Sequence, residues 1–180
     1  MLSWDRNKIV SGDWSFEIVK DFSVFNDFDC NDPDLNDFIR NEAKLYRDEL
    51  IVETYEFHSM SPDQLVAFVS LANDSLSLKT NRQKRIIPNR LRHSQYPAVK
   101  IARLGVKGRY QRGGVGTKLI NIVKELFTTN NRTGCRFVTV DAYNQDPVIR
   151  FYLSNDFKFS QIDDKDEKTR MMYLDLKRFE

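Results

Sequence analysis

VKIARLGVKGRYQRGGVGTKLINIVK, residues 99–124, is the stretch around which the rest of this sequence is organised. Five of the seven glycines fall between Gly105 and Gly116, between an apolar run and an amphipathic one. The run at residues 99–106 is rich in Ile, Val, Leu and Ala, which is typical of a strand buried on both faces. The apolar residues after the glycines recur at spacings of three and four, which predicts a helix with one apolar side: Val115, Leu119, Ile122, Val123, Leu126 and Phe127.

A glycine-rich turn that opens a helix is suited to bind a polyphosphate. The first turn of a helix presents unpaired N–H groups and the positive end of the helix dipole, and glycines let an anion reach those amides. The segment QRGGVG, residues 111–116, lacks the GK[ST] ending of a P-loop, and no second glycine motif with a downstream acid indicates a dinucleotide site. The alternative is an ordinary tight turn before a helix that tolerates glycine.

Composition bounds the class of protein. A chain of 180 residues with 41% apolar content can bury a full core, and no linker divides it, so one domain is expected. We expect a cytoplasmic protein without a membrane partner, because the sequence shows neither a signal peptide nor an apolar run of spanning length. Cys30 and Cys135 lack metal-ligand spacing and are expected to be reduced and buried. His58 and His93 are expected to be ordinary loop residues.

The charge of this chain is distributed unevenly. Between Asp74 and Glu125 there is no acidic residue but thirteen Lys and Arg, whereas the rest of the chain has fifteen basic and twenty-six acidic residues. A charge run is usually a solvated face, but one of this length that includes the glycine-rich turn is suited to attract a polyanion.

The remaining elements follow from local patterns. Residues 1–13 are polar and aperiodic, which predicts an N-terminal arm. Asp32-Pro33 and Asp146-Pro147 predict two further helix starts. Residues 79–96 are basic and interrupted by proline, and are expected to form an insertion that is a short helix, a loop or both. Besides residues 99–106, apolar or alternating runs predict strands at residues 16–20, 51–57, 65–72, 136–141, 157–162 and 171–176.

This order of elements, together with two motifs, resembles the GNAT family of N-acetyltransferases. QRGGVG fits the family's pyrophosphate pattern Q/R-x-x-G-x-G/A. The segment VDAYNQDPVIRFYLSNDFKF, residues 140–159, resembles a second family pattern, with Asp156 in place of a helix-ending glycine. Aspartate tolerates the left-handed conformation that such a cap requires. The residues that match this second pattern are Val140, Ala142, Asn144, Phe151, Tyr152 and Phe157.

The resemblance implies the fold and the co-substrate. The fold is α/β (α+β): a single GNAT-like domain, residues 14–180, with a mixed central sheet of about six to seven strands flanked by helices, preceded by the arm at residues 1–13. Acetyl-CoA is the implied co-substrate, with no metal.

The resemblance also implies roles for individual residues. The thioester would lie against the backbone of Leu104, Gly105 and Val106, where Gly105 suits a splayed or bulged strand. Tyr152 would donate its proton to the departing thiolate, or would simply pack beside Phe151. The pyrophosphate would lie over the amides that follow the strand: Gln111, Arg112, Gly113, Gly114, Val115, Gly116 and Thr117.

The role of Asn144 and the identity of a general base are left open by the residues. Asn144 would hold the coenzyme or cap a turn. No general base is evident, because Glu53, Glu56 and Asp141 are candidates by position but a carboxylate in such a place is more often simply solvated. An amine that is already neutral near pH 7 would need no base.

The identity of the acceptor amine is also left open by the sequence. The segments FDCNDPDLNDFIRNEA, residues 28–43, and YPAVKIARLGV, residues 96–106, resemble the toxin-type members of the family, which acetylate the amino group of aminoacyl-tRNA. That resemblance implies tRNA and a ribbon-helix-helix antitoxin as partners, and a homodimer is a further candidate assembly. Many such toxins have ARLAVD where this chain has ARLGVK. The alternatives are an enzyme that acetylates a small-molecule or protein amine, and a non-catalytic acyl-CoA-binding module.

Overall fold

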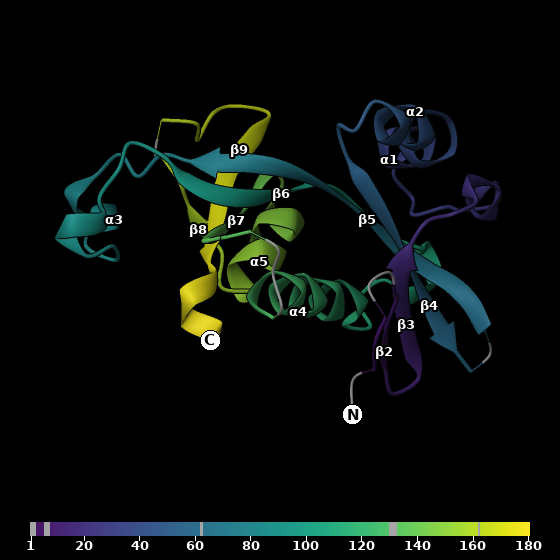
Figure 1. Ribbon diagram of the computed structural model, residues 1–180. Helices are drawn as coiled ribbons and strands as arrows, with labels where there is room; N and C mark the ends of the chain where they lie inside the picture. The colour runs from purple at the N-terminus through teal and green to yellow at the C-terminus, as the bar shows by residue number, and fades with distance from the viewer. Residues whose placement is uncertain (1–2, 6–7, 62, 130–132, 162) are drawn as a thin grey trace. The chain divides into compact units, whose positions relative to one another are not determined.

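The computed structural model describes residues 3–5, 8–61, 63–129, 133–161 and 163–180 (Figure 1). Its strands form one nine-stranded sheet in the order β1-β2-β3-β4-β5-β6-β7-β9-β8. The sheet is mixed, because β6 and β7 pair in parallel while β7 and β9 pair antiparallel. The strands are β1 (Ser3–Asp5), β2 (Lys8–Ser11), β3 (Trp14–Ile18), β4 (Glu53–Met60), β5 (Asp63–Leu76), β6 (Tyr96–Val106), β7 (Phe137–Tyr143), β8 (Lys158–Phe159) and β9 (Thr169–Asp175).

The helices follow the expected pattern. Asp32 caps the first helical segment, since its side chain accepts a hydrogen bond from the Leu35 N–H. The helices are α1 (Pro33–Asp37), a π-helical turn η2 (Phe38–Glu42), α2 (Ala43–Asp48), α3 (Asn81–Lys84), α4 (Val115–Thr128) and α5 (Asp146–Ser154). The short 3-10 turns are η1 (Phe22–Phe25), η3 (Asn89–Leu91), η4 (Gly108–Tyr110) and η5 (Leu176–Phe179).

Three expectations about the sheet and its helices are corrected. The sheet has nine strands rather than six or seven, because β1 and β2 lie within residues 1–13 and β2 pairs with β3. Residues 3–5 and 8–11 are therefore not an aperiodic arm, although the domain boundary placed after residue 13 stays a prediction. Helix α5 begins at Asp146 itself, and its N-cap residue Gln145 makes no side-chain cap.

The chain divides into two compact units, which three elements run through. Unit 1 comprises Met1–Ala72 and Ala102–Ile120, and unit 2 comprises Asn73–Ile101 and Asn121–Glu180. Strands β5 and β6 and helix α4 each begin in one unit and end in the other.

The core of unit 1 is built on phenylalanine rings. Phe68 on β5 is fully buried, and its ring meets those of Phe25 and Phe28 edge-on at 5.9 and 5.3 Å between centroids. Phe38 and Ile39 of the π-helical turn pack into the same cluster. Burial of these rings is what attaches the first helical segment to the strands of unit 1.

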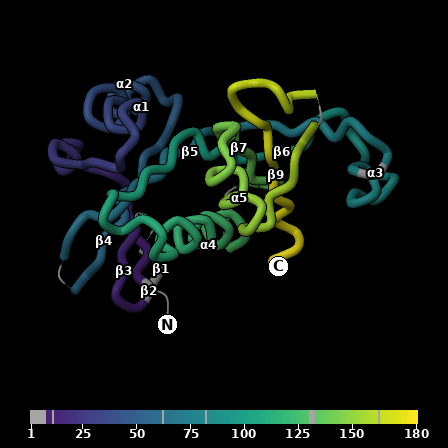
Figure 2. The backbone as a smooth tube through the Cα atoms, turned by 180° about the vertical axis from the view of Figure 1, so that it is seen from behind, coloured from purple at the N-terminus to yellow at the C-terminus, as the bar shows by residue number. Residues whose placement is uncertain are grey.

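The core of unit 2 gathers the C-terminal strands. Phe137 on β7 is fully buried and packs edge-on against Tyr96 and Tyr173. Helix α5 lies beside β7 in both views of the backbone (Figures 1 and 2). The helix ends as predicted from the motif, with Asp156 in the left-handed region at φ 71°.

The basic insertion contains both helix and loop. Thr80 and Gln83 form a capping box at the start of α3, and η3 follows Pro88. The Gln83 side chain also donates to the Ser160 carbonyl at 2.6 Å, which attaches the insertion to the strand region of unit 2.

Candidate active site

The residues predicted to bind phosphate, 111–117, lie in unit 1. They belong to the segment 107–117, called the phosphate loop below, which consists of η4, a turn and the start of α4. Arg112 and Gly114 have positive φ values of 61° and 80°, which turn successive amides in a common direction. Among the described residues, the N–H groups of residues 112–117 donate to no acceptor. Consecutive unbonded amides at a helix start form a site for an anion.

The loop is attached to residues 28–31 by hydrogen bonds. The Gly108 N–H donates to the Asp29 carbonyl at 3.0 Å. The Gln111 side-chain amide donates to the Cys30 carbonyl at 2.7 Å and to the Val106 carbonyl at 3.0 Å. The backbone N–H of Gln111 donates to the Gly108 carbonyl at 3.3 Å. The N–H groups of Gln111 are therefore engaged within the protein, unlike those of the six residues that follow.

Gly105 is required by packing. A Cβ atom there would lie 2.5 Å from Cε1 of Phe68, a distance that a buried ring in a full cluster cannot relieve by moving. The approach of the Phe68 ring to the β6 backbone is thus a reason for glycine at this position, while the splayed or bulged strand expected at Gly105 stays a prediction. Its neighbours Leu104 and Val106 are half-buried at the end of the same strand.

The cationic side chains around the phosphate loop have no carboxylate partner in the described part of the chain. Four of them instead lie over aromatic rings at distances of 4.4 to 5.9 Å. Burial, followed by the charge of Arg109, lowers the pKa of Lys107. The pairs are Arg103 over Phe38, Lys107 over Phe28, Arg109 over Tyr110 and Lys118 over Trp14, and Arg112 is the fifth cation.

Asn144 and Tyr152 both belong to unit 2. The Asn144 side-chain amide donates to the carbonyls of Lys165 and Glu167 at 2.8 and 2.9 Å, so it holds the turn before β9. Tyr152 is buried, and its ring packs against Phe151 and Phe157 with centroids 5.0 and 5.2 Å apart. Burial raises the pKa of the Tyr152 phenol, so the hydroxyl keeps its proton at neutral pH.

Comparison with known proteins decides the family. The model of the acetyltransferase (GNAT) family matches residues 17–157. The chain belongs to this family. It is therefore an acetyltransferase, and the matched range includes the predicted phosphate loop and helix α5. No curated protein matches the chain.

Solved structures of similar fold include bacterial toxins of known architecture. The chain aligns with a tyrosine-to-phenylalanine mutant of KacT at 21% identity and a TM-score of 0.74, covering 92% of this chain and 96% of that one. A mutant AtaT toxin bound to the C-terminus of the antitoxin AtaR and acetyl-CoA aligns at 17% identity and a TM-score of 0.69, covering 92% and 95%. AtaT complexed with acetyl-methionyl-tRNA aligns at 19% identity and a TM-score of 0.68, covering 93% and 97%.

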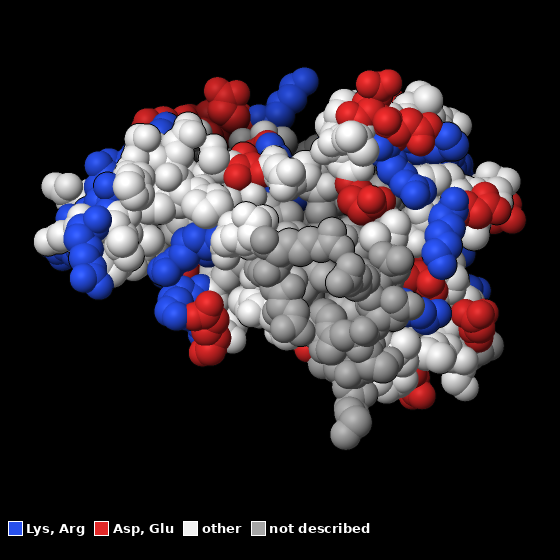
Figure 3. Space-filling view, in the orientation of Figure 1, with Lys and Arg blue, Asp and Glu red and all other residues white. Residues whose placement is uncertain are grey.

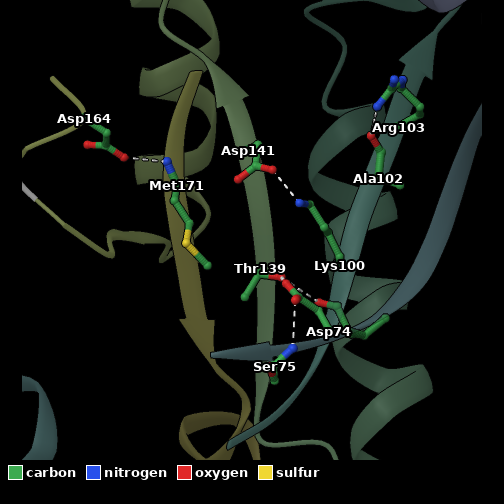
Figure 4. Close-up of polar contacts among 10 residues, drawn as sticks. Asp74, Ser75, Lys100, Ala102, Arg103, Thr139, Asp141, Asp164 and Met171 are labelled. Atoms are coloured by element: carbon green, nitrogen blue, oxygen red, sulfur yellow. Dashed lines mark hydrogen bonds and ion pairs between the residues drawn. The ribbon is translucent and has the colours of Figure 1, made fainter. Parts of the chain in front are cut away.

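Each of the three candidate bases of this GNAT domain lies near a basic side chain. Glu53 lies 3.5 Å from Arg47, and Glu56 lies 3.3 Å from His58. Asp141 on β7 pairs with Lys100 on β6, and Figure 4 shows the two side chains pointing toward each other. A nearby positive charge favours the ionised form of a carboxyl group, which makes these carboxylates weaker bases.

Other kinds of site receive no support in the described ranges. No group of three or more His, Cys, Asp or Glu there is placed to hold a metal ion. Cys30 and Cys135 are unbridged thiols, and burial raises the pKa of both, that of Cys135 to about 11, which keeps them unreactive. No helix described is both long and apolar enough to cross a membrane.

The structure thus brings residues 104–117 together in unit 1, whereas Asn144 and Tyr152 belong to unit 2. Sequence reasoning missed the contact of residues 28–31 with the phosphate loop, which is made by the carbonyls of Asp29 and Cys30. The local signal that could have found these residues is the Asp-Cys-Asn sequence at residues 29–31, because Asp and Asn favour Asx turns. In the structure the Asp29 side chain accepts a hydrogen bond from the Asn31 N–H at 2.8 Å, and Asn31 has a positive φ of 60°. The sequence analysis also predicted that His58 lies in a loop, whereas this residue lies on β4.

Proposed function

We propose that this acetyltransferase transfers the acetyl group of acetyl-CoA to the amino group of aminoacyl-tRNA. The observation that carries the proposal is the acid-free stretch between Asp74 and Glu125. Apart from Lys100 and Lys124, no described basic side chain in that stretch lies within ion-pair distance of a carboxylate. Unpaired cations in that number supply the sequence-independent attraction on which nucleic-acid binding depends.

The coenzyme occupies the phosphate loop in this proposal. Its pyrophosphate lies on the unbonded amides of residues 112–117, and its thioester lies along the backbone of residues 104–106. The positive charges of Lys107, Arg109 and Arg112 favour the anion without forming part of an internal ion pair. The acetyl-CoA carried by the similarly folded AtaT supports this assignment.

The chemistry is a direct acyl transfer. The neutral amine attacks the thioester carbonyl carbon, the carbon–sulfur bond breaks, and the amine nitrogen loses a proton to solvent. The Tyr152 hydroxyl donates its proton to the departing thiolate and is later reprotonated. Because an ordinary phenol near pKa ~10 is a weaker acid than a thiol near ~8.5, we expect this transfer to contribute only roughly 10²-fold.

The tRNA contacts the basic insertion of unit 2. Lys and Arg atoms gather over the α3 segment in the space-filling view (Figure 3). Arg85, Arg90 and Arg92 are exposed there, and Lys84 is half-buried. Phosphate contacts of this kind position an RNA without reading its bases, so affinity should not depend on which amino acid is attached.

Partners are proposed on the same grounds. The AtaT structure with the C-terminus of its antitoxin supports an antitoxin as a partner of this chain, and the resemblance of the sequence to toxin-type GNAT members implies that it is of the ribbon-helix-helix type. We place the protein in the cytoplasm, where aminoacyl-tRNA is found, and retain a homodimer as its candidate assembly.

Salt dependence tests the acceptor. Arg82, Lys84 and Arg85 are replaced together by Gln, and tRNA binding is measured between low and physiological salt. For each tRNA phosphate that the variant no longer binds, the slope of log affinity against log salt should become shallower by roughly one unit, while acetyl-CoA affinity stays unchanged. The matched control replaces three lysines that are ion-paired at the surface, Lys44, Lys165 and Lys177, by Gln.

Two results would contradict the proposal. A wild-type protein that acetylates no aminoacyl-tRNA pool and does not arrest growth on expression would leave a small-molecule or protein amine as the acceptor. A protein that binds acetyl-CoA but turns over no amine would be a non-catalytic module.

A further inference from the structure

The side chain of Gln111 uses both of its N–H donors inside the protein. A carboxamide has two donors, and here the nitrogen lies 2.7 Å from the Cys30 carbonyl and 3.0 Å from the Val106 carbonyl. One carbonyl precedes α1 and the other ends β6, so a single side chain joins two segments that flank the phosphate loop. Gln111 itself follows η4 within that loop.

The hydrogen-bond network continues from Cys30 to the first turn of α1. The Asp29 carboxylate accepts hydrogen bonds from the Asn31 N–H and the Asn36 side chain, both at 2.8 Å. The Asn36 side-chain oxygen in turn accepts from the Cys30 N–H at 3.0 Å. Residues 29–36 are thus one connected polar unit.

The same two segments are also in direct steric contact. A Cβ atom on Gly108 would lie 2.4 Å from Nδ2 of Asn31. The Gly108 N–H donates to the Asp29 carbonyl at 3.0 Å from the same position. The loop therefore rests on residues 29–31 without space for an added methyl group.

We propose that Gln111 is a positioning residue that couples the phosphate loop to residues 29–36. It does not bind the coenzyme by its side chain. It holds the loop in the conformation that exposes the amides of residues 112–117, and coenzyme binding in turn stabilises the first turn of α1. This coupling rests on the proposed acetyl-CoA site.

The first test compares three variants by calorimetry with acetyl-CoA alone. Gln111→Leu keeps the size of the side chain but has no donor, and its affinity should fall roughly 10- to 100-fold, the cost of removing two hydrogen bonds. Gln111→Arg restores donors, and it should recover at least half of that loss on a logarithmic scale. Gln95→Leu, at an exposed glutamine in unit 2, is the matched control and should bind as wild type.

Hydrogen exchange gives a readout that a merely structural role would not move. In the wild type, saturating acetyl-CoA should slow exchange at the amides of Leu35 and Asn36. In Gln111→Leu at saturating acetyl-CoA, this protection should be absent while helix α4 is still protected. For turnover, KM for acetyl-CoA should rise with the dissociation constant while kcat changes less than about twofold.

A double-mutant cycle keeps the proposal falsifiable if Gln111→Leu fails to fold. Gly108→Ala should weaken acetyl-CoA binding through its collision with Asn31. Asn31→Gly removes the colliding side chain and tolerates the positive φ, so it should restore binding in the double variant. Additive effects would overturn the coupling.

The outcomes separate this inference from the proposed function. A wild-type protein that does not bind acetyl-CoA would overturn the coenzyme site itself. A wild type that binds it, beside a Gln111→Leu variant of equal affinity and equal protection at residues 35–36, would overturn the positioning role alone.

Discussion

The cations around the phosphate loop and those of the C-terminal strands differ in one respect. In both regions a cation lies over an aromatic ring: Lys118 over Trp14 at 4.4 Å in unit 1, and Arg170 over Phe159 at 4.1 Å in unit 2. Arg170 also lies 2.7 Å from the Asp164 carboxylate, whereas Lys118 has no carboxylate partner among the described residues.

An aromatic ring and a carboxylate both hold a cationic side chain in place, but only the carboxylate neutralises its charge. A ring attracts a cation by about 0.5–1 kcal/mol at an exposed site but leaves its full charge available to a ligand. A carboxylate cancels that charge and, when buried, ties the two chain segments together. The cations around the phosphate loop thus keep their positive charge available to a ligand. The charge of Arg170 in the C-terminal strands is instead neutralised by Asp164.

The largest effect is expected from placing a carboxylate into the phosphate loop. Gly116→Glu sets a negative charge and a long side chain among the amides of residues 112–117. Like charges brought together cost several kcal/mol, so acetyl-CoA affinity should fall about a thousandfold or more while the protein stays folded. Calorimetry and circular dichroism check the two parts.

The matched control for Gly116→Glu is Gly134→Glu, because Gly134 is exposed and a Cβ atom there meets nothing within 4 Å. Equal affinity in the two glutamate variants would show that the coenzyme does not lie on the loop.

The second prediction tests whether unit 2 contributes a proton donor, the hydroxyl of Tyr152, to the reaction. Tyr152→Phe removes only the hydroxyl proposed to protonate the thiolate. It should lower kcat by roughly ten- to a thousandfold with little change in acetyl-CoA affinity, because the interaction arises only as the thiolate leaves. Wild-type turnover in this variant would exclude the acid role.

The third prediction breaks a carboxylate pair in unit 2. Arg170→Met leaves the Asp164 carboxylate, only 7% exposed, with the Met171 N–H as a remaining partner at 2.8 Å (Figure 4). An unpaired buried charge is costly, so the free energy of unfolding should fall by about 3 kcal/mol. Acetyl-CoA affinity should stay unchanged, as measured by urea unfolding and calorimetry on the same samples.

The corresponding change in the loop region should have the opposite profile. Lys107→Met keeps the packing on Phe28 but removes the charge, and no described carboxylate loses a partner. Stability should change by less than about 0.5 kcal/mol, while acetyl-CoA affinity should fall about threefold at low salt and less at high salt. A large loss of stability here would break the distinction between the two regions.

Particular residues explain what could be predicted from the sequence. The strand, loop and helix at residues 99–124 were predictable because glycine spacing and apolar periodicity are local properties. Strands β1 and β2 were missed because their pairing is set by neighbours in the sheet rather than by alternation in so short a run. The role of Gln111 depends on a carbonyl 81 residues away, which no local pattern encodes.

The smallest expected effect concerns the stability contributed by His58 in unit 1. Its imidazole lies between two carboxylates, which is a third kind of environment for a basic side chain. His58 on β4 has Nε2 3.3 Å from Glu56 and Nδ1 3.2 Å from Asp63, while Lys8 pairs with Glu17 nearby. The nearby Glu56 carboxylate is the largest cause that raises the pKa of His58, against an opposing effect of burial. A raised pKa means that the folded state holds the proton more tightly than the unfolded state.

The stabilisation from His58 should therefore be fully present below its ordinary pKa near ~6.5 and be lost as pH rises through the higher folded value. We expect His58→Gln to remove this dependence, a difference of about 0.5 kcal/mol between pH 5.5 and 8.5 in urea unfolding. His93→Gln, at the loop histidine, is the control and should keep the wild-type dependence. If wild type and His58→Gln lose stability equally across that range, Glu56 and Asp63 do not stabilise a protonated His58. Pairing with carboxylates would then stabilise the C-terminal strands but not the β4–β5 hairpin.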